Sequence, residues 1–224
     1  MKNIFDNAQV RDNAKVYDNA KLHGNSKVLD NAQIYGNAEL FDNAGLLGDS
    51  KAYGNAKLYN NSHLLNDVEI YDNAELYGYV SIHGNSHIFG NAKINDESRI
   101  YDSSVYDYAQ IYGESILNNS RIYGNSIIEH SKLQHYVNVY GNVEIYSSSI
   151  EGPSEIYDNA KLYDCNISGN TKIYGKSYLF DTMLYGNIII CGNSFLYKCK
   201  IKTKHKYNIK ICGKARLKNN IELL

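Results

Sequence analysis

Histidine is the residue type in this chain that is best suited to metal binding or proton transfer. His130 and His135 are five residues apart, and His83 and His87 are four apart. A catalytic zinc ion needs at least three convergent protein ligands, so a pair of histidines is not a site by itself. The sequence also gives His83 no place in a Ser-His-Asp triad. We therefore interpret these histidines as solvated side chains.

The four cysteines lie in the C-terminal third and lack the paired CxxC spacing of common metal sites. We expect reduced thiols rather than a disulfide framework. Cys165 and Cys199 occupy small, inward positions of the sequence pattern, whereas Cys191 and Cys212 occupy outward positions that could be neighbours. Two thiols without further ligands do not make a metal site, so the sequence predicts neither a metal nor a cofactor.

These residues belong to one repeated six-residue phrase. Residues 10–27 read VRDNAKVYDNAKLHGNSK, in which an aliphatic residue, a variable residue, Asp or Gly, Asn, a small residue and a polar residue recur. The phrases run from Ile4 to the one that starts at Leu196, and the aliphatic residue is Val, Leu or Ile except at Ala52. One inward residue in six predicts a short strand followed by a corner, because a helix would follow a different period. Asp, Gly and Asn suit the corner because they tolerate left-handed backbone geometry.

Two features indicate that three phrases complete one coil. Seven phrases lack one residue, and the last five of these deletions recur every 17 residues, from Ser131 to Cys199, as one shortened corner per coil requires. In addition, every third phrase has an aromatic ring after its aliphatic residue. This row, the aromatic column, contains Tyr17, Tyr35, Tyr53, Tyr71, Phe89, Tyr106, Tyr123, Tyr140, Tyr157 and Tyr174. The sequence therefore predicts an all-β fold, a single-domain triangular parallel β-solenoid of about eleven coils.

The phrases, such as IYGNAE and VYDNAK, resemble the hexapeptide repeat of left-handed parallel β-helices over residues 4–201. The resemblance implies a left-handed coil, which is an exception to the usual right-handed crossover. The phrases are also similar to those of uncharacterised VYGNA-type repeat proteins from bacteria and their phages. Enzymes of the hexapeptide family commonly place Gly or a small residue where this chain has Tyr.

The resemblance brings two enzyme activities into consideration. Acyltransferases of the family work, as it implies, at trimer interfaces with a histidine and long loops that hold the substrates. This chain has no insertion between its phrases, and a pocket needs concavity, so we expect flat walls and no enzymatic activity. Gamma-class carbonic anhydrases also resemble this architecture and hold zinc with three histidines. His130 and His135 match the spacing of two of them, but the third has no counterpart at the expected distance upstream.

If the walls are flat, function is predicted to lie on them. Three leucines stack outward beside Gly45 and form a leucine strip that consists of Leu29, Leu47 and Leu65. The same row continues with His83 and Tyr101, and we take these five residues as the candidate interface because a monomer rarely leaves such an apolar row uncovered. The aromatic column is expected to be packing, because rings repeating every ~4.8 Å leave little open face for a base or a sugar.

Charge is segregated along the chain. Residues 198–224 hold nine of the 23 basic residues and one of the 24 acidic ones, which leaves the preceding 197 residues with a net charge of -9. We divide the chain into a β-helix over residues 1–201 and, over residues 202–224, a basic loop with a C-terminal capping coil of the same domain. A candidate basic patch that could bind a phosphate backbone consists of Lys202, Lys204, Lys206, Lys210, Lys214 and Arg216.

The function predicted from these features is a non-enzymatic scaffold or binding protein that engages a protein partner or a second copy through its walls. The alternative is a phage or mobile-element inhibitor of a host nucleic-acid enzyme, which would act by acidic mimicry. A further alternative is a hexapeptide acyltransferase. The sequence has neither a secretory leader nor an apolar run long enough to cross a bilayer, so we expect a cytoplasmic protein without membrane contact.

Overall fold

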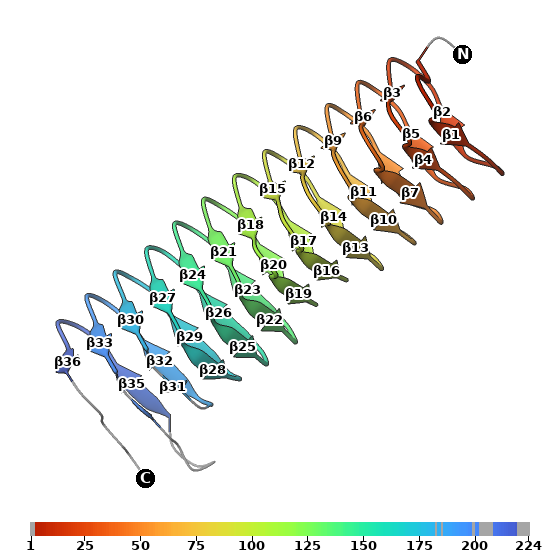
Figure 1. The fold of residues 1–224 in the computed structure, drawn as a ribbon. Coiled ribbons are helices and arrows are strands. Elements are labelled where there is room, and N and C mark those ends of the chain that lie inside the picture. The colour runs from red at the N-terminus through yellow and green to blue at the C-terminus, as the bar shows by residue number, and fades with distance from the viewer. Residues whose placement is uncertain (1–2, 182, 185, 199, 202–207, 219–224) are drawn as a thin grey trace. The chain divides into compact units, whose positions relative to one another are not determined.

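The computed structural model describes residues 3–181, 183–184, 186–198, 200–201 and 208–218, and these residues form strands and corners without a helix. The chain divides into two compact units, Met1–Glu114 and Ser115–Leu224. In each unit every coil contributes one strand to each of three parallel sheets, which we call A, B and C (Figure 1). The prediction of an all-β parallel solenoid with about eleven coils, the architecture of a left-handed β-helix, is confirmed.

In unit 1, each sheet has six strands. Sheet A contains β3 (Lys21–Leu22), β6 (Glu39–Leu40), β9 (Lys57–Leu58), β12 (Glu75–Leu76), β15 (Lys93–Ile94) and β18 (Gln110–Tyr112). Sheet B contains β1 (Gln9–Val10), β4 (Lys27–Val28), β7 (Gly45–Leu47), β10 (His63–Leu65), β13 (Ser81–His83) and β16 (Arg99–Tyr101). Sheet C contains β2 (Lys15–Val16), β5 (Gln33–Ile34), β8 (Lys51–Ala52), β11 (Glu69–Ile70), β14 (His87–Ile88) and β17 (Ser104–Val105).

Unit 2 repeats this arrangement. Sheet A contains β21 (Ile127–Glu129), β24 (Glu144–Tyr146), β27 (Lys161–Tyr163), β30 (Tyr178–Phe180), β33 (Phe195–Tyr197) and β36 (Arg216–Lys218). Sheet B contains β19 (Ile116–Asn118), β22 (Lys132–Gln134), β25 (Ser149–Glu151), β28 (Asn166–Ser168), β31 (Met183–Leu184) and β34 (Lys200–Ile201). Sheet C contains β20 (Arg121–Ile122), β23 (Val137–Val139), β26 (Ser154–Ile156), β29 (Thr171–Ile173), β32 (Ile188–Ile190) and β35 (Ile209–Ile211).

The core of each unit is built from two residues per phrase. The aliphatic residue points inward and is fully buried, as Leu22, Ile34 and Leu40 show. The small residue before the next strand is also buried, for example Ala20 and Ser26. Small side chains are needed at this position because two walls converge at each corner and leave little volume.

The corners use the residue types that the phrase predicts. The third residue of the phrase has a positive φ, which is 56° at Asp6 and 68° at Gly24. The Asp6 carboxylate accepts a hydrogen bond from the backbone N–H of Gly24 in the next coil, with an N···O distance of 2.9 Å. An added Cβ at Gly84 would meet the carboxylate of Asp102, which would have to move. Asp therefore supports the corner of the following coil as well as its own turn.

The asparagines of the phrase form ladders along the corners. Asn19 Nδ2 donates to Asn37 Oδ1 at 3.2 Å, and Asn37 Nδ2 donates to Asn55 Oδ1 at 3.1 Å. The same ladder continues through Asn73 to Asn91. Each amide donates to one neighbour and accepts from another, so the recurring asparagine links successive coils through side chains.

The aromatic column stacks along sheet C as predicted. In unit 1, from Tyr17 to Tyr106, successive ring centroids are 4.7–4.9 Å apart and the ring planes differ by 1–6°. In unit 2, from Tyr123 to Tyr174, the centroid distances are 4.9–5.0 Å. Rings at this spacing cover one another's faces. The column is therefore packing within the wall.

The shortened phrases fall at two different corners. Ser103 and Ser120 lie between sheets B and C, whereas Ser131, Ser148 and Cys165 lie between sheets A and B. Two further shortened phrases, at Thr182 and Cys199, lie outside the described residues. From β21 to β29, unit 2 thus has short corners between sheets A and B and full-length corners between sheets B and C.

The C-terminal segment is described only in part. Lys202, Lys204 and Lys206 of the predicted basic loop lie outside the described residues. Beyond them, β35 pairs with β32, and β36 pairs with β33. The division of the chain into a β-helix and a capping coil stays a prediction.

Candidate interaction surfaces

The leucine strip lies on the outer face of sheet B in unit 1. Leu47 pairs with Leu65, Leu65 with His83, and His83 with Tyr101. Leu29 follows Val28, which pairs with Leu46. All five side chains of the candidate interface are half-buried. They form one row, as the sequence predicts, and their role in binding stays a prediction.

A second row runs beside the strip and contains Gly45, His63 and Ser81. An added Cβ at Gly45 would lie 2.7 Å from Nδ1 of His63, so the imidazole ring rests against the glycine backbone. Burial, together with the charge of Lys27, lowers the pKa of His63. The ring is therefore neutral near pH 7.

The two rows together form a surface without ionised side chains at neutral pH. We call it the uncharged face, and it consists of Gly45, Leu47, His63, Leu65, Ser81 and His83. Sheets A and C of unit 1 differ, because ion pairs occupy the corresponding row. Lys21 and Glu39 approach to 2.9 Å on sheet A, and Lys51 and Glu69 approach to 2.7 Å on sheet C.

Ser81 and His83 make a contact that the sequence did not predict. Ser81 Oγ lies 2.7 Å from His83 Nε2, and the His83 ring stacks on Tyr101 with a centroid distance of 5.0 Å. Burial lowers the pKa of His83, so its ring is neutral near pH 7 and shares a hydrogen bond with the Ser81 hydroxyl. A serine nucleophile also needs a group that orients its base. In the described part of unit 1, no carboxylate bonds to this ring, and the contact holds His83 against Tyr101.

His130 and His135 lie at different corners and face different partners. His130 Nε2 is 3.9 Å from a carboxylate oxygen of Glu129, and His135 Nδ1 is 3.6 Å from one of Glu151. Both histidines have a positive φ and exposed side chains. Among the described residues, no three His, Cys, Asp or Glu side chains gather in a way that could hold a metal ion.

The described members of the candidate basic patch do not share one face. Lys210 lies on β35 of sheet C, Arg216 lies on β36 of sheet A, and Lys214 lies at the corner between them. Lys210 and Lys214 are exposed. This arrangement gives no support to a nucleic-acid partner, and the patch stays a prediction.

The expectation of reduced thiols is wrong for Cys191 and Cys212, which form a disulfide. Both lie on sheet C at the position after the aliphatic residue, where earlier coils carry the aromatic column. The bond therefore replaces ring stacking in the two coils beyond Tyr174. Cys165 is buried, as predicted, and Cys199 lies outside the described residues.

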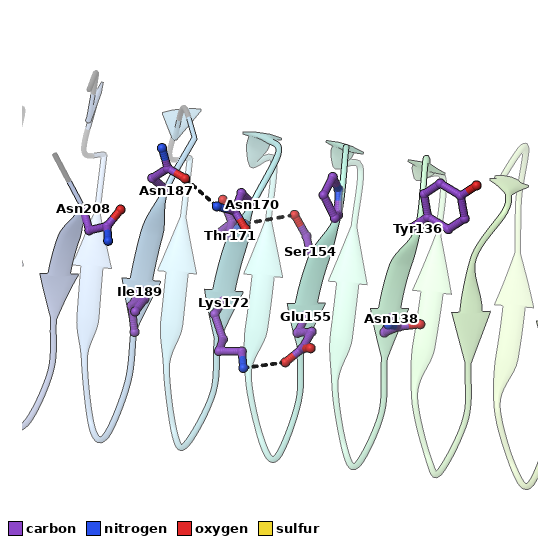
Figure 2. A pocket seen from close by; sticks show the side chains of 11 residues that line it. Tyr136, Asn138, Ser154, Glu155, Asn170, Thr171, Lys172, Asn187, Ile189 and Asn208 are labelled. Atoms are coloured by element: carbon purple, nitrogen blue, oxygen red, sulfur yellow. Dashed lines mark hydrogen bonds and ion pairs between the residues drawn. The ribbon is translucent and has the colours of Figure 1, made fainter. Parts of the chain in front are cut away.

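The expectation of flat walls is wrong for unit 2, where sheet C carries an open groove of about 450 Å³. Figure 2 shows the lining side chains along several neighbouring coils. The lining contains Tyr136, Asn138, Pro153, Ser154, Glu155, Asn170, Thr171, Lys172, Asn187, Ile189 and Asn208. Sequence analysis missed this groove because its edge depends on which corner keeps its full length in each coil.

The described part of the chain contains no helix with the length and hydrophobicity that a bilayer crossing requires.

Comparison with known proteins gives matches in structure but not in sequence. No family profile and no curated protein matches the chain. A protein from Desulfovibrio desulfuricans G20 that is assigned as an acetyltransferase matches with a TM-score of 0.37 and 9% identity, over 95% of this chain and 68% of that one. UDP-N-acetylglucosamine O-acyltransferase from Moraxella catarrhalis matches with a TM-score of 0.34 and 18% identity, over 82% and 71%. The Arabidopsis UDP-N-acetylglucosamine acyltransferase matches with a TM-score of 0.33 and 13% identity, over 95% and 68%.

These matches concern the fold alone, and they do not include the VYGNA-type repeat proteins of bacteria and phages. They nevertheless correct one expectation. The three solved structures named above are described as an acetyltransferase and two acyltransferases. The prediction that the chain is not an enzyme is therefore wrong as stated, because a fold shared with enzymes gives no ground for excluding catalysis.

Proposed function

We propose that the chain is a protein-binding β-solenoid and that the uncharged face of unit 1 contacts a protein partner. The uncharged face carries the proposal, because it combines an aliphatic row with neutral neighbours that are buried or half-buried. The other two walls of unit 1 present ion pairs in the equivalent row. An apolar centre without charges is the usual composition of a protein interface core.

The rim of the face indicates the charge of the partner. Lys27 lies before the face on sheet B, and Arg99 lies after it. Both side chains are exposed. A partner with an apolar centre and acidic residues at both ends would therefore be complementary. A second copy in antiparallel orientation would instead bring Lys27 close to Arg99, which favours a different protein over self-association.

Acidic mimicry of nucleic acid receives less support. The carboxylates of Asp6, Asp18 and Asp72 accept hydrogen bonds from backbone N–H groups of the next coil. Those of Glu39 and Glu69 pair with lysines. These five carboxylates are thus engaged within the wall rather than presented as a free array.

The test is quantitative capture of partners from a lysate of the source cell, followed by reconstitution with the purified partner. Leu47→Glu places a charge in the centre of the uncharged face and should weaken the complex by about 30-fold or more, because the charge would be buried without a counterion. Gln33→Glu adds the same charge at a half-buried position on sheet C and should leave binding unchanged.

Native mass measurement separates the remaining outcomes. If the native mass shows a complex of this chain alone, and this complex dissociates in Leu47→Glu, the partner is a second copy of the chain and not a different protein. The proposal is contradicted if the chain stays monomeric and every protein that it captures binds Leu47→Glu as well as it binds the wild type.

A further inference from the structure

The groove on sheet C of unit 2 is bounded by two rows of side chains. A corner row between sheets B and C contributes Tyr136, Pro153, Asn170, Asn187 and Asn208. The strands themselves contribute the outward residues Asn138, Glu155, Lys172 and Ile189. Five successive coils take part, and at ~4.8 Å per coil the corner row is about 19 Å long. The groove is therefore linear and suits an elongated ligand.

The lining has no net charge. Its two charged side chains, Glu155 and Lys172, form an ion pair with an N···O distance of 2.7 Å. This pairing raises the pKa of Lys172, and the two opposite charges compensate each other. A phosphate or sulfate would meet the Glu155 carboxylate beside the one lysine. An anionic ligand is therefore disfavoured.

The remaining lining is rich in amides. Asn170 and Asn187 hydrogen-bond to each other (Figure 2). Within the described residues, the side chains of Asn138 and Asn208 make no hydrogen bond. An amide offers two donors and an acceptor with two lone pairs, which is the combination that pairs with hydroxyl groups. The groove thus presents unused donors and acceptors along its length.

Tyr136 stands at one end of the corner row and is unusual in two respects. Its side chain is 68% exposed, and its φ is 70°. A positive φ is uncommon for a bulky residue and costs about 1–3 kcal/mol, so such positions are found at functional sites. The backbone N–H of Tyr136 donates to Asn119 O at 2.8 Å, which holds the residue in place. Figure 2 shows the ring at this corner.

Two further ligand classes fit poorly. A peptide cannot extend the sheet here, because β26 and β29 already pair with neighbours on both sides. Apart from the ring of Tyr136, apolar side chains would find only Pro153 and Ile189 in the lining. The features that remain are an open aromatic face, neutral amides and a linear shape.

We infer that this groove binds a linear, uncharged oligosaccharide, with Tyr136 stacked on one sugar ring and the asparagine amides bonded to hydroxyl groups. An aromatic ring presents an apolar face to the C–H groups of a sugar, while the amides replace the water that the hydroxyls lose. The site lies in unit 2, so it is independent of the uncharged face in unit 1.

The experiment measures binding of neutral hexasaccharides of β-1,4-glucose, β-1,4-N-acetylglucosamine and α-1,4-glucose to the full chain, by calorimetry and saturation-transfer NMR. We expect at least one of them to bind. Tyr136→Ala should weaken that binding by about tenfold or more, as expected for loss of an anchor residue. Asn170→Ala should weaken it as well, because a hydroxyl of the sugar would lose its partner.

The matched control is Tyr79→Ala, which removes an equally prominent tyrosine, 67% exposed, from a corner of unit 1. It should leave sugar binding unchanged, and circular dichroism of each variant verifies folding. The inference is overturned if none of the three sugars binds, or if binding survives in both Tyr136→Ala and Asn170→Ala. It is also overturned if a heparin hexasaccharide or a neutral hexapeptide binds more tightly than the sugars.

Discussion

Tyr35 and Tyr53 stack face to face, with ring centroids 4.9 Å apart and ring planes that differ by 2°. They are 18 residues apart, so three six-residue phrases carry the chain once around the coil. This relationship assigns the outward residues of unit 1 that precede the shortened corner at Ser103 to their walls. The position of the leucine strip on sheet B follows from the same count.

The stack predicts a measurable contribution to stability. Tyr53 lies between Tyr35 and Tyr71, so Tyr53→Ala removes two ring contacts and should lower the free energy of unfolding by about 1–3 kcal/mol. Tyr53→Phe keeps both contacts and loses only the hydroxyl contact to Glu69, so its effect should be about 0.5–1.5 kcal/mol. Urea denaturation of the three proteins measures the difference.

The matched control for this prediction is Tyr79→Ala, because Tyr79 is exposed. Its effect should be within about 0.5 kcal/mol of zero. Equal losses for Tyr53→Ala and Tyr79→Ala would mean that the column contributes nothing beyond a generic surface tyrosine.

The asparagine ladder predicts a variant whose stability depends on pH in an unusual direction. In Asn37→Asp, the carboxylate still accepts from Asn19 but faces Asn55 Oδ1, to which Asn37 donated. Only the protonated acid restores that hydrogen bond, so its pKa in the folded state should be above the unfolded value of about 3.9. A raised pKa stabilises the fold below about pH 4, and this stabilisation is lost as the pH rises through the folded pKa.

The measurement for the ladder is the stability difference between Asn37→Asp and the wild type at pH 3 and pH 7. The free energy of unfolding of Asn37→Asp should be closer to that of the wild type at pH 3 than at pH 7. Asn37→Ala loses both hydrogen bonds at either pH and is the matched control. A difference that is the same at both pH values for Asn37→Asp would show that the ladder does not form.

Much of the fold could be predicted because each coil repeats the same physical requirements. The aliphatic side chain must point inward, and each ring of the aromatic column must stack on the equivalent ring of the next coil. Tyr35, Tyr53 and Tyr71 therefore reveal the coil length directly. The handedness was taken from a family resemblance, because phrase length alone does not distinguish a left-handed coil from a right-handed one.

The surface features were harder to predict because they depend on departures from the repeat. The pairing of Cys191 with Cys212 spans 21 residues rather than 17 or 18, since the phrase breaks between them. The groove depends on Tyr136 standing at a full-length corner, whereas the preceding coil has a shortened corner at Ser120. The contact between Ser81 and His83 depends on the rotamers of both side chains, which the sequence does not reveal.

The disulfide predicts that reduction loosens one end of unit 2. Cys191 follows β32 and Cys212 follows β35, so the bond ties these two strands together. A cross-link that closes a loop of about this length contributes on the order of 3 kcal/mol by restricting the unfolded chain. Reduction should therefore speed hydrogen exchange of Ile209–Ile211, measured by mass spectrometry.

The control for the disulfide is the double variant Cys191→Ser and Cys212→Ser. Its residues Ile209–Ile211 should exchange as fast as in the reduced protein, and the reductant should not change this rate. The strand β3 in unit 1 should exchange at the same rate in every sample. Exchange of Ile209–Ile211 that is equal before and after reduction would contradict a stabilising cross-link.

His63 predicts how stability and partner binding depend on mild acid. Burial lowers its pKa in the folded protein, so the unfolded chain binds the proton first as the pH falls below about 6.5. The free energy of unfolding should therefore decrease from that pH down through the folded pKa, and His63→Gln should flatten this decrease. Added salt screens the influence of Lys27 but not burial, so the decrease should persist at high ionic strength. A charged imidazole would also lie in the centre of the uncharged face, so binding of the partner should weaken over the same pH range in the wild type. The weakening should be smaller in His63→Gln, in which His83 remains as the other titrating group of the face. Binding that stays constant between pH 7 and pH 5 would exclude His63 from the contact.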